Sequence, residues 1–232
     1  MKELPIRFLA PMVRAILEGR KTQTRRVVNP QPNMMRWHPV QLNRNQGWED
    51  EHGKPFNCPY GIPGDRLHVK EGAWMFCERR PNGKTKTGRQ KWRYVPLADA
   101  PILYAVETPK KPTIEVAHPI TTNQWEWRYK TARFLPRWAS RITLLVKSVR
   151  VERLQTISEE GAIAEGICIP DCIGLSACGG GCDSCESTAT HKDHFRNLWQ
   201  SLNGKRPGCS WKENPWVWVV EFERTEKEPS HG

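Results

Sequence analysis

The segment AILEGRKTQTRR, residues 15–26, contains the end of one expected element and the start of the next. Apolar residues recur at helical spacing after Pro11, and Gly19 follows the last of them, where a glycine commonly ends a helix. The stretch 22–28 is rich in β-branched residues, which favour a strand. The segment therefore predicts a helix, a glycine turn and a strand, with Lys21 at the turn.

Outward from this segment, the pattern predicts several short strands and two further helices. Polar runs rich in turn-forming or charged residues predict loops, and the stretch 107–130 has no clear pattern. Parallel strand–helix–strand alternation is not evident. We expect strands at 6–9, 66–70, 102–106, 141–151 and 216–223, helices at 158–166 and 194–202, and loops at 29–57 and 79–92. This mixture predicts an α+β fold built on a small, curved or closed sheet with flanking helices.

The composition favours a folded protein that acts outside membranes. A hydrophobic content of 38% and eleven tryptophans provide enough apolar surface for a core. No apolar stretch is long enough to cross a bilayer, and the N-terminal residues lack the core of a signal peptide. We therefore expect a cytoplasmic protein with no membrane partner.

The net charge of +11 and the pI near 9.4 indicate an anionic partner, because a positive field attracts phosphates. A basic surface that only confers solubility is the alternative. Between residues 125 and 141, aromatic side chains alternate with arginines and lysines, a pattern that suits unpaired bases and their phosphates. Burial in a core is the other common fate of such aromatic residues.

Lys21 directly follows the expected helix end, and Thr22, Thr24, Arg25 and Arg26 lie beyond it. The spacing of Lys21 and Thr24 bears on whether their side chains can meet. They are three positions apart, so an ideal strand would direct them to opposite faces. They meet only if the backbone is irregular near Lys21. The simpler interpretation is a basic helix end that complements the helix dipole, followed by a threonine-rich strand.

Four segments together resemble the activating signal cointegrator homology (ASCH) domain, a relative of the PUA domain, and in order and spacing the larger ASCH proteins of phages and prophages. They are residues 15–26, 63–71, 157–166 and 216–222. The resemblance implies a PUA-like small mixed β-barrel flanked by a few helices, with long loop insertions. It also implies one domain over residues 1–225, with insertions at about 29–57, 79–100 and 168–192, and a disordered tail at 226–232.

Small bacterial members of this family are amidohydrolases that remove the acetyl group from N4-acetylcytidine. Their catalytic lysine, threonine and glutamate correspond to Lys21, Thr24 and Glu165. The resemblance thus implies a hydrolase of N4-acylated cytidine or a related modified nucleoside, with no cofactor for catalysis. Either Thr24 or a water molecule serves as the nucleophile, with Lys21 as base and Glu165 as proton shuttle. The alternative is a non-catalytic module that binds RNA or modified DNA.

The remaining candidate residues would bind the modified nucleoside, or RNA or another single-stranded nucleic acid. Apart from one glutamate, they are cations, which suit phosphates, or aromatic residues, which suit bases. We expect this role for Arg20, Arg25, Arg26, Glu71, Trp74, Arg137 and Trp138.

Five of the eight cysteines are crowded after the expected Glu165 helix, at Cys168, Cys172, Cys178, Cys182 and Cys185. In a reducing compartment such crowding favours a metal site over disulfides, and four of these five would hold a structural zinc ion. A reduced loop without metal is the alternative. A zinc deaminase site is disfavoured, because that chemistry uses a His-x-Glu element and the chain has none.

The zinc hypothesis predicts about one zinc ion per purified chain. Replacing two cluster thiolates, in the variant Cys182→Ser/Cys185→Ser, should abolish the bound metal, as measured by elemental mass spectrometry. Cys77→Ser, at an isolated position, is the control and should retain it. Wild-type protein purified without zinc under metal-replete conditions would contradict the hypothesis.

Overall fold

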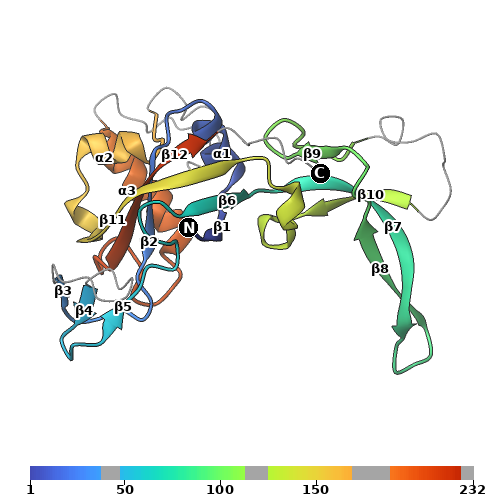
Figure 1. Ribbon diagram of the computed structural model, residues 1–232, viewed down its shortest axis with the longest axis horizontal. Coiled ribbons are helices and arrows are strands. Elements are labelled where there is room, and N and C mark those ends of the chain that lie inside the picture. The colour runs from blue at the N-terminus through green and yellow to red at the C-terminus, as the bar shows by residue number, and fades with distance from the viewer. Residues whose placement is uncertain (38–47, 113–124, 169–188, 226–232) are drawn as a thin grey trace. The chain divides into compact units, whose positions relative to one another are not determined.

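The computed structural model describes residues 1–37, 48–112, 125–168 and 189–225 (Figure 1). Strands predominate over helices, so the α+β class is confirmed. The helices are α1 (Ala10–Leu17), α2 (Glu159–Ala164) and α3 (His191–Asn203). The strands are β1 (Glu3–Arg7), β2 (Gln23–Val27), β3 (Met35–Trp37), β4 (Trp48–Asp50), β5 (Pro55–Phe56), β6 (Arg66–Lys70), β7 (Ala73–Lys84), β8 (Gln90–Pro96), β9 (Ile102–Tyr104), β10 (Trp125–Lys130), β11 (Thr143–Arg153) and β12 (Trp216–Thr225).

The largest sheet has five strands in the order β1-β6-β11-β12-β2. Its centre is the long antiparallel pair β11 and β12, which runs from Thr143 opposite Thr225 to Arg153 opposite Trp216. The predicted barrel is not closed among the described residues, where β1 and β2 are the two edges of an open sheet. The end of α2, rather than a further strand, lies beside the residues that precede β2. Only a single β-bridge, between Lys21 and Glu165, forms there.

The chain divides into two compact units. The first contains Met1–Pro5, Ala15–His68 and the chain from Ile142 onward; the second contains Ile6–Arg14 and Val69–Arg141. The stretch expected as an insertion at 79–100 belongs to the second unit, and the stretch at 29–57 belongs to the first.

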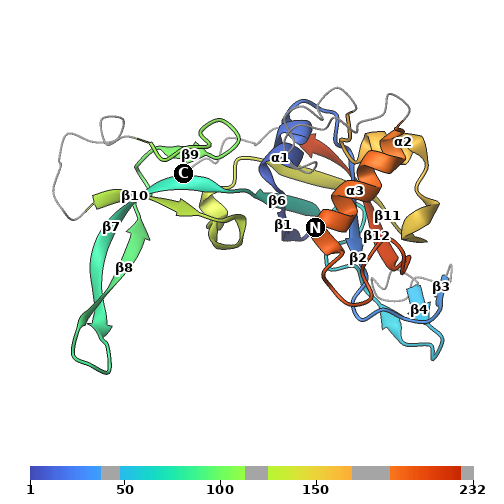
Figure 2. The same cartoon turned by 180° about the vertical axis from the view of Figure 1, so that it is seen from behind.

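The core of the first unit lies between α2, α3 and one face of the sheet (Figure 2). Phe195 and Trp199 on α3 pack with Val217 and Val219 on β12 and with Leu154. The indole N–H of Trp199 donates to the carbonyl of Cys209 at 2.8 Å, which satisfies its buried polar atom. α3 starts at a capping box, with Thr190 as N-cap and Asp193 as its partner. This packing fixes α2, whose end carries Glu165.

The second unit contains a sheet in the order β10-β7-β8, with β9 also paired to β7. Alternate residues of β7 face opposite sides. Ala73, Met75 and Cys77 pack in one cluster, while Phe76 contacts Trp127 on the other side.

Two expected loops contain strands. The loop predicted at 79–92 is wrong, because this stretch forms most of the β7–β8 hairpin, with Arg79 opposite Tyr94 and Lys84 opposite Gln90. Its charged residues obscured the strand pattern, and cross-strand pairing outweighs their low β-propensity. The stretch 29–57 contains the three-stranded sheet β3-β4-β5.

Among the described residues, no helix has the length and apolar character needed to span a membrane.

Two leucines test the position of the first unit's core. Leu154 is fully buried, whereas Leu202 on α3 is 44% exposed. Leu154→Ala should lower the free energy of unfolding by about 2–5 kcal/mol, because it removes methyl groups from a packed site. Leu202→Ala should change it by less than about 0.5 kcal/mol. Urea unfolding of both variants measures the difference, and equal effects would contradict this core.

Candidate functional site

Lys21 occupies the turn between α1 and β2. Gly19 has a φ of 75°, the left-handed conformation that glycine adopts readily, and the amides of Arg20 and Lys21 both donate to the carbonyl of Ala15. The side chain of Lys21 is 1% exposed. Its Nζ donates to the Gln23 carbonyl at 2.8 Å, to the Glu165 carbonyl at 2.8 Å and to Glu165 Oε2 at 2.7 Å. The three hydrogens of the ammonium group therefore have three acceptors.

Glu165 comes to Lys21 from the end of α2. Ser158 caps the start of this helix by accepting from the Gly161 amide at 3.1 Å. After Glu165 the chain turns at Gly166, which has a φ of 84°. A Cβ at Gly166 would lie 2.9 Å from the Cβ atoms of Ala15 and Lys21. Glycine thus permits the backbone of the α2 terminus to lie directly against the turn after α1.

Arg25 is a second cation at the same carboxylate. Its Nη1 lies 3.4 Å from Glu165 Oε1, and its Nη2 lies 3.3 Å from Glu152 Oε2. The Arg25 side chain is almost completely buried. Each oxygen of Glu165 therefore faces a different cation, which holds the carboxylate in one orientation.

The pair belongs to a larger polar network that the sequence analysis missed. Arg150 donates to Gln23 Oε1 at 3.0 Å and also contacts Glu152 and Glu221. Glu221 in turn accepts from Ser148 at 2.7 Å. The sequence signal was present: residues 148, 150 and 152 are polar and alternate with the valines at 149 and 151, as expected for one face.

Burial lowers the pKa of Lys21 below its usual value of 10.5. The desolvation of the ammonium group is the largest effect, and the charge and hydrogen bond of Glu165 oppose it. Arg25 and Arg26 lower the pKa further by charge repulsion. The amine therefore releases a proton more easily than a lysine exposed to solvent.

Thr24 is buried on β2, opposite Val220 of β12. Gln23 and Arg25, its neighbours in the strand, contact the network on the side of Lys21 and Glu165. Strand alternation directs the Thr24 side chain to the other face. The structure brings Lys21 and Glu165 together and places Thr24 away from them.

Two other predicted binding residues border the site. Arg20 donates to the Gly166 carbonyl at 3.1 Å and forms an ion pair with Glu18. Arg26 is half-buried on β2, opposite Trp218. Their positions place positive charge beside Lys21 in the chain.

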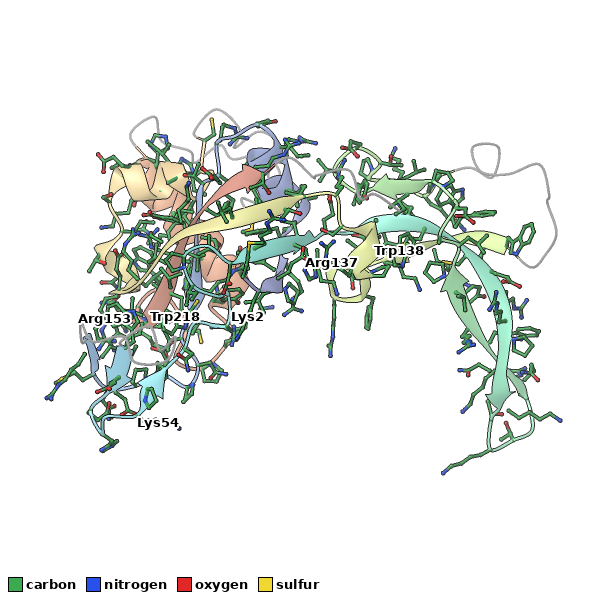
Figure 3. All side chains as sticks on the ribbon, viewed as in Figure 1. Lys2, Lys54, Arg137, Trp138, Arg153 and Trp218 are labelled. Carbon is green, nitrogen blue, oxygen red and sulfur yellow. The ribbon has the colours of Figure 1, made fainter. Side chains whose placement is uncertain are left out.

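The remaining predicted binding residues belong to the second unit. Glu71 is buried and pairs with Arg141, at 3.0 Å to its Nε, and Trp74 donates to the Thr108 carbonyl at 3.1 Å. Arg137 and Trp138 lie side by side on a 3₁₀ turn and are exposed (Figure 3). Exposure leaves this last pair accessible to a ligand.

Most of the predicted zinc site lies outside the described residues. This applies to Cys172, Cys178, Cys182 and Cys185, whereas Cys168 is described and half-buried. Within the described ranges, no three His, Cys, Asp or Glu side chains are grouped so that they could hold a metal ion.

Comparison of the chain with models of protein families, with curated proteins and with solved structures found no match.

The buried ion pair predicts unequal effects for its two partners. Glu165→Gln leaves Lys21 without a carboxylate and should cost about 3–5 kcal/mol of unfolding free energy. Lys21→Met should cost less, because Arg25 still faces Glu165. The control is the exposed pair Lys147–Glu223, at 2.8 Å, where Lys147→Met should cost less than about 1 kcal/mol. Chemical unfolding near neutral pH tests this order, and a Glu165→Gln effect as small as the control would contradict it.

Proposed function

We propose that the protein hydrolyses the acyl group of an N4-acylated cytidine or a related modified nucleoside, with Lys21 and Glu165 as its catalytic pair. The observation that carries the proposal is the 2.7 Å contact between these two buried side chains, which lie 144 positions apart in the chain. The resemblance to ASCH amidohydrolases, which have a PUA-like fold, supports the same assignment. The catalytic lysine and glutamate of those enzymes correspond to Lys21 and Glu165.

The pair has the groups that amide hydrolysis needs. A neutral Lys21 amine accepts a proton from water as the water oxygen attacks the acyl carbonyl carbon. The resulting ammonium passes a proton to Glu165, and Glu165 delivers it to N4 as the C–N bond breaks. The products are the free acid and the amino-bearing base, and the pair returns to its starting state. The lowered pKa of Lys21 increases the fraction of neutral amine.

Water is the nucleophile that fits this geometry. Thr24 lies on the other face of β2, so its hydroxyl is not directed at Lys21. The carboxylate of Glu165 is also the more exposed partner, at 6% against 1% for Lys21. We therefore infer that the substrate approaches from the Glu165 side, and that Thr24 acts in packing between β2 and β12.

One observation favours a second candidate, a non-catalytic module that binds RNA or modified DNA. All three hydrogens of the Lys21 ammonium group are accepted by protein oxygens. In that case the ion pair would only tie α2 to β2. The two candidates differ in whether the protein turns over a nucleoside.

Lys21→Arg separates the two candidates without removing the buried positive charge. A guanidinium still faces Glu165 but does not release a proton near neutral pH. Hydrolysis of N4-acetylcytidine, followed by chromatography of cytidine, should fall by at least about 100-fold. Lys147→Arg, in the exposed pair, should retain the wild-type rate.

Two results would contradict the proposed hydrolase activity. One is a folded Lys21→Arg variant with the wild-type rate. The other is wild-type protein that turns over no acylated nucleoside yet binds RNA oligonucleotides with strong salt dependence, which supports the binding module.

A further inference from the structure

The β7–β8 hairpin of the second unit carries a dense cluster of positive charge. From Arg79 to Arg93 the sequence has seven basic residues and no acidic residue. The basic residues are Arg79, Arg80, Lys84, Lys86, Arg89, Lys91 and Arg93. These positive charges repel one another, and binding of an anion reduces that repulsion.

These cations lie on an ordered two-stranded ribbon. β10 pairs with β7 as far as Glu78, and from Arg79 onward β8 is the paired strand (Figure 1). The tip is also hydrogen-bonded, since the Thr85 amide donates to the Arg89 carbonyl at 2.8 Å and the Arg89 amide donates to Thr85 Oγ1 at 3.0 Å. The positively charged side chains therefore project at regular intervals from a two-stranded β-ribbon.

Five of the seven cations are exposed and form no ion pair with any other residue in the described ranges: Lys84, Lys86, Arg89, Lys91 and Arg93. Two other arginines of the second unit are paired with acids: Arg128 with Glu126, and Arg141 with Glu71 and Glu107. Arg93 moreover lies directly opposite Arg80, where like charges are unfavourable. The hairpin thus has uncompensated donors that suit phosphates.

Two arginines lie over aromatic rings of β8. The guanidinium of Arg79 lies 4.1 Å from the centre of the Trp92 ring, and that of Arg128 lies 3.7 Å from the centre of the Tyr94 ring. One face of each ring is therefore occupied by a cation, which disfavours stacking of an unpaired base on it. This arrangement favours contacts to a phosphate backbone over the stacking that single strands use.

We propose that this hairpin binds double-stranded DNA by entering the major groove. The groove is about 12 Å wide and admits a two-stranded β-ribbon, and the paired backbones of such a ribbon are about 5 Å apart. Cations on both faces then reach the phosphates on both walls of the groove. This activity is separate from nucleoside hydrolysis, because Lys21 and Glu165 belong to the first unit.

The test measures binding of a fluorescein-labelled 20-base-pair DNA duplex by anisotropy at several salt concentrations. The variant Lys84→Gln/Lys86→Gln/Lys91→Gln should raise Kd by about ten-fold or more, and should reduce the slope of log Kd against log salt by about three, one for each lost phosphate contact. The control Lys54→Gln/Lys205→Gln/Lys212→Gln changes the net charge equally at exposed positions of the first unit and should bind like wild type.

Three results overturn the proposal. The first is equal weakening by the control, which would assign binding to the overall charge. The second is a single strand of the same sequence that binds as tightly as the duplex. The third is wild-type protein with no affinity for duplex at low salt.

Discussion

The buried contact between Lys21 and Glu165 connects two segments of the first unit that lie 144 positions apart in the chain. It joins the turn after α1 to the end of α2, and Gly166 allows the two backbones to approach closely enough for the contact to form. Placing a lysine and a glutamate out of water is costly, and attraction between them offsets that cost only when the remaining polar atoms are also satisfied. The structure meets this condition, because the amine has three acceptors and each carboxylate oxygen faces a cation.

The surrounding architecture explains why so polar a site is stable beside an apolar core. α3 packs Phe195 and Trp199 onto the sheet and fixes α2, and the same sheet face continues from Val219 into Glu221 and its partners. A hydrophobic region and a charge network therefore share one face of β12. Burial of this kind also lowers the pKa of Lys21, which gives the structural contact a chemical consequence.

Local signals in the sequence predicted much of this arrangement. The glycine at position 19, the cap at Ser158 and the long alternating strands placed α1, α2, β6, β11 and β12 close to their observed bounds. The contact of Lys21 with Glu165 followed from the family resemblance rather than from periodicity. Long-range pairing could not be predicted from the sequence. Arg150 and Glu221 contact each other because of the register between β11 and β12. The hairpin from Arg79 to Arg93 resembled a loop because its charged residues hide the alternation of a strand. The placement of Thr24 away from Lys21 followed from the same strand rule that the sequence had already indicated.

The proposed hydrolysis requires Lys21 to accept a proton, which its lowered pKa favours. The most direct measurement is a nitrogen NMR titration of Lys21 Nζ in selectively labelled protein, recorded together with the pH dependence of nucleoside deacylation. In the proposed mechanism the neutral amine is the active form, so activity should rise with pH through the Lys21 pKa, and both midpoints should coincide below 10.5. A Lys21 that stays protonated up to its ordinary pKa, or a rate that rises through a different midpoint, would rule out this mechanism.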